Sequence, residues 1–181
     1  LVDSGIVIVA NHFSEPKELS FFVVAISCVS PLIILFSPLQ NRILADPKQV
    51  LKQFSELNFF LVLPSFVVFT IAYYFAISVG VSRVFGNNYS SLADSAFAII
   101  LMGFLFLAFK ICNTLLRGLD LNLQSLSLSL ILVSLFTILC NVIPQSPQSL
   151  ILAANFSLGL ALLLLLLSQV IRHDIREKLS S

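Results

Sequence analysis

The sequence predicts an all-α polytopic membrane protein with about five transmembrane helices and one short interfacial amphipathic helix. Of its 181 residues, 58% are hydrophobic and 10% are charged, whereas soluble domains carry about 25% charged residues. The mean hydropathy is +1.02. Uncharged stretches cover residues 19–41, 57–82, 95–109 and 121–171. A water-soluble fold could not cover so much apolar surface, so we expect lipid to surround these stretches.

The predicted spans follow from the length of these apolar stretches. A helix rises 1.5 Å per residue and needs about 20 apolar residues to cross roughly 30 Å of hydrocarbon. Residues 121–171 therefore have room for two crossings, joined by a turn over residues 144–149 that contains Pro144 and Pro147. We expect spans at residues 19–39, 57–82, 91–116, 126–143 and 150–171.

A transmembrane β-barrel is disfavoured because its strands are segments of about 10 residues with strict alternation. Here the apolar runs are long and hydrophobic on all sides. Only residues 119–130 alternate leucine with polar residues, and a single alternating stretch has no partners with which to close a barrel. We interpret it as the lead-in to the fourth helix.

The loop between the first two spans predicts the short interfacial helix. Asp46 is a good N-cap, Pro47 suits the first helical position and Gln49 completes a capping-box pattern. Apolar residues then recur at helical spacing opposite charged ones, which are Lys48, Lys52 and Glu56. This pattern is typical of an amphipathic helix on a membrane surface. An ordinary extension of the second span is the alternative.

The orientation follows from the lysines and arginines, because positive charge near span ends is retained on the cytoplasmic face. The expected topology places only Lys17 and Arg83 on one side. The other side collects eight cations, namely Arg42, Lys48, Lys52, Lys110, Arg117, Arg172, Arg176 and Lys178. We therefore expect residues 1–18 to be an extracytoplasmic segment, residues 19–171 the transmembrane domain and residues 172–181 a cytoplasmic tail.

Lys110 is the one basic residue that interrupts an apolar run. Asn113 and Arg117 follow it at three and seven residues, so a helix would place all three on one face. An ionisable group at membrane depth suggests function, and this polar stripe is a candidate contact for a lipid headgroup or a substrate. The alternative is that the Lys110 stem extends to the cytoplasmic interface.

Two ladders of small residues predict close helix packing, because small side chains let helix backbones approach in lipid. Their members are four residues apart: Ala72, Ala76 and Gly80 in the second span, and Ala153, Ser157 and Ala161 in the fifth. Whether each partner helix belongs to this chain or to another subunit is open at the level of sequence.

No catalytic, cofactor or metal motif is visible, so we expect a protein that is not an enzyme and needs no cofactor. Cys28, Cys112 and Cys140 each lie in an apolar run without a CxxC pair. His12 and His173 lie outside the expected spans, on opposite faces. The net charge of +1 gives no sign of nucleic-acid binding.

Residues 45–48, with the sequence Ala-Asp-Pro-Lys, are followed by Leu63-Pro64 and then by leucine-rich stretches. In these features, residues 45–144 resemble the Yip1-type polytopic membrane proteins, which have about five helices and often carry an amphipathic segment beginning with Asp-Pro or Asn-Pro. The resemblance implies a noncatalytic role in membrane organisation or vesicle traffic. That family places its amino terminus in the cytoplasm, whereas the charge count here places the start of the chain outside.

The sequence is therefore interpreted as an integral membrane protein that acts as a scaffold, an assembly factor or an accessory subunit. Its expected partners are the lipid bilayer and other membrane subunits or further copies of itself. The alternative is a small transporter or channel component. It is suggested by Lys110, by Pro31 inside the first span, and by a weak inverted repeat around Pro16-Lys17 and Pro47-Lys48.

Overall fold

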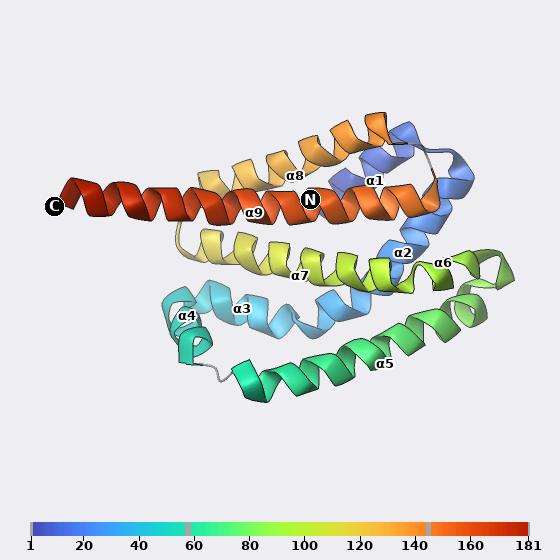
Figure 1. Ribbon diagram of the computed structural model, residues 1–181, viewed down its shortest axis with the longest axis horizontal. Helices are drawn as coiled ribbons and strands as arrows, with labels where there is room; N and C mark the ends of the chain where they lie inside the picture. Colours follow the sequence, from blue (N-terminus) through green and yellow to red (C-terminus); the bar gives the residue numbers. More distant parts are fainter. Residues whose placement is uncertain (1, 57–58, 144–145, 181) are drawn as a thin grey trace.

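The chain forms a bundle of long helices, with shorter helices packed beside them and at its ends (Figure 1). The computed structural model describes residues 2–56, 59–143 and 146–180, and every regular element within them is a helix. Five of the described helices are long and apolar enough to cross a membrane. They are α2 (Pro16–Leu35), α5 (Phe59–Phe85), α7 (Ala96–Gly118), α8 (Asn122–Val142) and α9 (Pro147–Ser180). The predicted all-α class with five candidate spans is confirmed.

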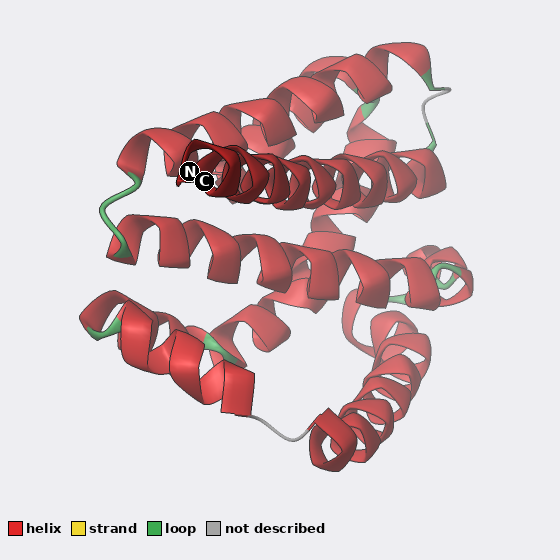
Figure 2. Ribbon diagram, turned by 60° about the vertical axis from the view of Figure 1, so that its left-hand side comes forward, coloured by secondary structure: helices red, strands yellow, loops and turns green. Residues whose placement is uncertain are grey.

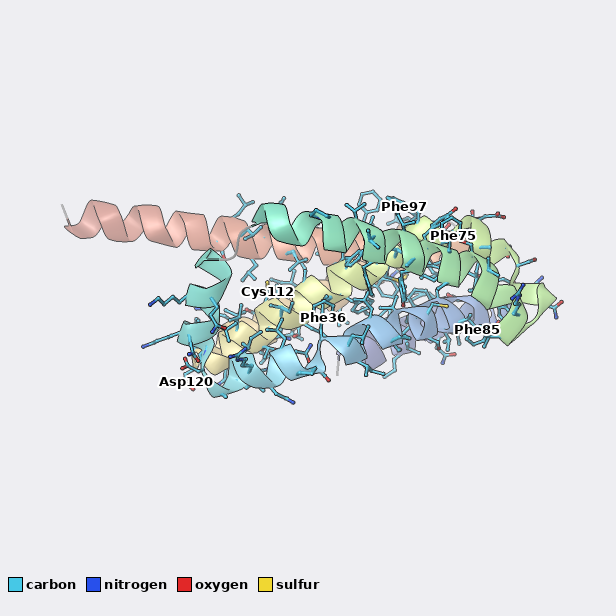
Figure 3. All side chains as sticks on the ribbon, turned by 90° about the horizontal axis from the view of Figure 1, so that it is seen from below. Phe36, Phe75, Phe85, Phe97, Cys112 and Asp120 are labelled. Atoms are coloured by element: carbon cyan, nitrogen blue, oxygen red, sulfur yellow. The ribbon has the colours of Figure 1, made fainter. Side chains whose placement is uncertain are left out.

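The first span ends earlier than predicted, at Leu35 rather than at residue 39. Phe36 leaves the helical conformation, and α3 (Ser37–Ala45) then begins with Pro38 in its first turn. Proline has no N–H to donate to the carbonyl four residues earlier, and its ring clashes with that carbonyl. Pro38 therefore separates α3 from α2, and Figure 3 shows Phe36 at this junction.

Pro31 lies inside α2 without ending it. The Ser27 and Ser30 hydroxyls donate to the carbonyls of Val23 and Ile26, at 2.9 and 3.2 Å. Such bonds to the preceding turn often accompany helix bending. The Tyr73 hydroxyl of α5 donates to the Cys28 carbonyl, so a polar group from a second span is bonded to backbone beside the proline.

The short helix α4 (Pro47–Glu56) confirms the helix that Asp46 and Pro47 predict. The Gln49 N–H donates to Asp46 Oδ1 at 3.0 Å, which is the expected N-cap bond. Val50 is buried, whereas Lys48 and Lys52 are exposed. In Figure 1, α4 runs across the direction of the long helices and is separate from α5. It is therefore a distinct amphipathic helix, and the alternative of a simple extension of the second span is wrong.

Two further features were not predicted. Residues of the expected amino-terminal segment form α1 (Val2–Phe13), which packs against α8 and α2 with Ile6 and Ala10 fully buried. Between α5 and α7 lie a 3-10 turn, η1 (Asn87–Tyr89), and one turn of helix, α6 (Ser91–Asp94). The predicted third span began at residue 91, but Ser95 separates α6 from α7.

The fourth and fifth helices are both longer than the predicted spans. α8 begins at Asn122, not at residue 126, and α9 continues to Ser180, beyond the predicted end of the fifth span at residue 171. Ser146 caps α9 by accepting a bond from the Ser149 N–H at 3.1 Å. Leu57, Pro144 and Gln145 lie outside the described residues, as do the side chains of Arg172, His173, Arg176 and Lys178.

The core is organised around α7 and α9, in each of which 44% of the residues in an 18-residue apolar stretch are buried. Phe22 of α2 and Phe136 of α8 stack with ring centroids 5.9 Å apart. Asn155 Nδ2 of α9 donates to the Ala98 carbonyl of α7 at 3.0 Å. Figure 2 shows α5 at the margin of this bundle, so one candidate span has much less internal contact than the others.

The α7–α8 loop meets the α3–α4 junction at one end of the molecule. A Cβ at Gly118 would lie 3.0 Å from the Ile43 carbonyl oxygen and 3.3 Å from Pro47 Cβ. Figure 3 shows Asp120 at this end and Phe85 towards the opposite end. The cations on α3 and α4 and the end of α7 therefore share one end of the bundle.

Candidate functional site

A polar cavity of about 670 Å³ lies among α3, α7 and α8. Its described lining contains two cations, Lys110 and Arg117, with the amides Gln40, Asn113 and Asn122 and the hydroxyls Thr114, Ser125 and Ser129. Four apolar residues complete the wall: Phe109, Leu126, Leu130 and Val133. Lys110, Asn113 and Arg117, the polar stripe identified in the sequence, thus all line the same cavity.

A hydrogen-bond network joins α7 to α8 on the cavity wall. Asn113 Nδ2 donates to Ser129 Oγ at 3.2 Å, and Ser125 Oγ donates to Asn113 Oδ1. Arg117 Nε donates to the same Ser125 Oγ at 3.1 Å. Ser125 is only 2% exposed, and buried polar groups are costly unless they are bonded. The network therefore fixes the positions of Asn113 and Arg117.

Helical spacing explains why these side chains meet. Asn113 and Arg117 are four residues apart in α7, and Ser125 and Ser129 are four apart in α8, so each pair lies on one helix face. The two serines were not predicted as site residues, because residues 119–130 were noted for their alternation. Four-residue spacing of the serines is the signal that would have found them.

Gln40 is the contribution of α3 to the cavity. Its Nε2 atom is buried and has no hydrogen-bond partner among the described residues. A buried donor without a partner is unusual and needs an explanation. The sequence did not single out Gln40, since only the break at Phe36 and the start of α3 bring it beside α7.

The two small-residue ladders have different surroundings. On α9, Ala153, Ser157 and Ala161 are all buried inside the chain. On α5, Ala72 and Ala76 are exposed, and a Cβ added at Gly80 would meet nothing within 4 Å. The α9 ladder therefore contacts other helices of this chain, whereas the α5 ladder faces outwards.

The fold defines a polytopic helical membrane protein, because five described helices have the length and composition to cross a bilayer. Comparisons with protein families, with curated proteins and with solved structures find no match. The resemblance to the Yip1-type proteins stays a prediction from sequence.

Proposed function

We propose that this protein is a noncatalytic accessory subunit or scaffold of a membrane complex, and that a helix of another subunit packs on α5. The observation that carries the proposal is the outward-facing ladder of Ala72, Ala76 and Gly80. Small residues at such spacing allow close helix approach in lipid, and this chain supplies no helix to fill that position within its described residues.

The weak internal packing of α5 supports this role. In its candidate span, Val67–Phe85, 12% of residues are buried inside the chain, against 28–44% in the other four. Val68 and Phe75 are 67% and 61% exposed. The described contacts of α5 are chiefly with α6, η1 and α7. A helix held mainly by its neighbours in sequence is well placed to take a partner along its free side.

The chemistry of the polar cavity supports a noncatalytic role. A serine nucleophile needs an adjacent general base, but the Ser125 hydroxyl is bonded to the Asn113 amide and the Arg117 guanidinium. Neither group accepts a proton near neutral pH. The Thr114 hydroxyl donates to the Lys110 carbonyl at 2.7 Å, so it is engaged with backbone.

The second candidate function is a small transporter or channel component, favoured by the length of α8 that lines the cavity. Its lining extends along α8 from Asn122 to Val133, which is roughly 16 Å of helix and about half of a bilayer core. This alternative predicts solute flux in reconstituted vesicles that Lys110→Ala abolishes. The accessory-subunit proposal predicts no such flux.

Purification in a mild detergent tests the accessory-subunit proposal. We expect the chain to copurify with another membrane protein, and the double substitution Ala72→Leu with Ala76→Leu to reduce its recovery about tenfold, because an overpacked interface costs about 1–3 kcal/mol. Ser134→Leu is the matched control, since Ser134 is exposed on α8. It should leave recovery unchanged.

Two results would overturn the proposal. One is a solitary monomer with no copurifying protein. The other is a ladder variant that changes only the association of the chain with further copies of itself, which would make α5 a self-association surface.

A further inference from the structure

We infer that the polar cavity among α3, α7 and α8 binds the phosphate group of an anionic phospholipid. The inference concerns a different part of the molecule from the α5 ladder and does not depend on it. It rests on three observations: an excess of hydrogen-bond donors in the cavity, a buried donor without a partner, and an apolar wall that continues onto the outer surface of α8.

The cavity presents donors to a ligand. Arg117 uses Nε to bond Ser125, and its two terminal nitrogens carry further N–H donors in the same plane. Lys110 adds a second positive charge to the lining, and no acidic residue lies among its described members. Phosphate oxygens are acceptors only, and arginine binds them in a bidentate fashion. Charge and donor count together favour an anionic group with acceptor oxygens, such as a phosphate.

Gln40 adds an independent indication of a ligand. Its Nε2 is buried at the cavity without a partner in the described chain, and burial of an unbonded amide is unfavourable. A phosphate oxygen would satisfy it. The donor comes from α3, whereas the two cations come from α7, so the ligand would be held from two helices.

The apolar lining indicates a lipid. Leu126 and Leu130 of α8 line the cavity and are 58% and 59% exposed. In a membrane, these side chains would face the acyl chains of the bilayer. A phosphate group held by Arg117 would therefore have its glycerol and acyl chains beside α8, on the surface where bilayer lipid is already present. A soluble phosphate would use none of this apolar surface.

The depth of the site also fits a headgroup. Arg117 lies in the last turn of α7, and Lys110 is seven residues deeper, about 10 Å along the axis. Arg42, Lys48 and Lys52 lie at the same end of the bundle on α3 and α4. Basic residues at one membrane surface attract anionic lipids by roughly 1 kcal/mol each, so they would raise the local concentration of the ligand.

The test uses the purified full chain in detergent, with dioctanoyl phosphatidylglycerol as the probe and its thermal unfolding midpoint as the readout. Dioctanoyl phosphatidylcholine, whose phosphate charge is cancelled by its choline cation, controls for the acyl chains and for a phosphodiester without net charge, and inorganic phosphate controls for the anion alone. A ligand that binds only the folded state raises the midpoint in a saturable way. We expect a saturable rise with the anionic lipid and a much smaller change with either control compound.

Variants locate the binding. Arg117→Gln and Lys110→Gln should each weaken the affinity for phosphatidylglycerol roughly tenfold or more, since each removes a charged hydrogen-bond donor. Arg83→Gln is the control: Arg83 is exposed in the last turn of α5, at the opposite end of the molecule, and does not line the cavity. Gln40→Leu should weaken lipid binding without lowering the unfolding midpoint of the lipid-free protein, because it removes an unpaired buried donor.

Three outcomes would overturn the inference. An equal response to phosphatidylcholine would show that the cavity does not recognise the net negative charge of the headgroup. An equal response to inorganic phosphate would assign the cavity to a soluble anion. A loss of affinity in Arg83→Gln as large as in Arg117→Gln would mean that the net charge of the chain, rather than the cavity, attracts the lipid.

Discussion

At the scale of single residues, the turn between α7 and α8 depends on Asp120. Its φ is 59°, in the left-handed region, and the other described residue with positive φ is Gly86. The Leu121 N–H donates to the Leu116 carbonyl at 2.8 Å, and the Asp120 N–H donates to the Arg117 carbonyl at 3.0 Å. This is the bond pattern of a Schellman motif, in which glycine usually takes the left-handed position.

Substitution of Asp120 should therefore raise or lower the stability of the folded chain, depending on the new residue. Asp120→Gly removes the Cβ strain and should stabilise the folded chain by about 0.5 kcal/mol, whereas Asp120→Ala should destabilise it by about 1 kcal/mol. Thermal unfolding in detergent measures both. A fall in the midpoint for the glycine variant, or equal midpoints for the two variants, would contradict this account.

Two aspartates show what sequence can predict at this scale. Asp46 was predicted as an N-cap because proline and a capping-box glutamine follow it, and the structure contains the bond to Gln49. Asp120 is not followed by such a pattern. Its left-handed conformation depends on where α7 ends, and that end lies against the Ile43 carbonyl. A conformation that depends on tertiary contact is not visible in local sequence.

At the scale of helices, Gly118 sets how closely α7 approaches the α3–α4 junction. A Cβ at this position would lie 3.0 Å from the Ile43 carbonyl oxygen, a backbone atom that cannot move aside without shifting α3. Gly159 in α9 has nothing within 4 Å of the same built atom. Gly118 is the last residue of α7 and Gly159 lies inside α9, so the two glycines contrast a packed helix end with an open helix interior.

We expect Gly159→Ala to stabilise the chain by about 0.5–1 kcal/mol, because alanine is the better helix former. Gly118→Ala, at the last residue of α7, makes a smaller local gain and introduces the contact with the Ile43 carbonyl. A net loss of about 1–2 kcal/mol is expected, in line with other overpacked sites. The difference between the two unfolding midpoints is the measurement, and equal stabilisation by both substitutions would refute the close approach.

The helices also show why some elements were predictable and others were not. The length of the apolar runs was enough to identify all five spans. The break at Phe36, which ends the first span early, and the single turn α6 depend on backbone geometry that hydropathy does not report. α1 has 12 residues, too few to suggest a crossing. Three of the twelve described cavity-lining residues were predicted, because Lys110, Asn113 and Arg117 lie on one helix face, whereas Gln40 required the tertiary arrangement.

At the scale of the whole molecule, the fold explains the uneven distribution of lysine and arginine between the two ends of the bundle. Arg42, Lys48, Lys52, Lys110 and Arg117 are on α3, α4 and the second half of α7, elements that meet at one end. Lys17 begins α2 and Arg83 ends α5, near the opposite end. Positive charge near short loops is retained in the cytoplasm. The orientation proposed for the protein therefore places the α3–α4 end, where Gln40 and Arg117 line the cavity, on the cytoplasmic side.

Cysteine accessibility tests this orientation directly. In a background with Cys28, Cys112 and Cys140 replaced by alanine, Gln49→Cys places a thiol on α4 and Asn88→Cys places one in η1, both at exposed positions. A membrane-impermeant maleimide should label Asn88→Cys on intact cells and label Gln49→Cys only after the membrane is opened. The reverse pattern would invert the topology. Labelling of both in intact cells would rule out a single orientation and would remove the reason to place the lipid cavity in the cytoplasmic leaflet.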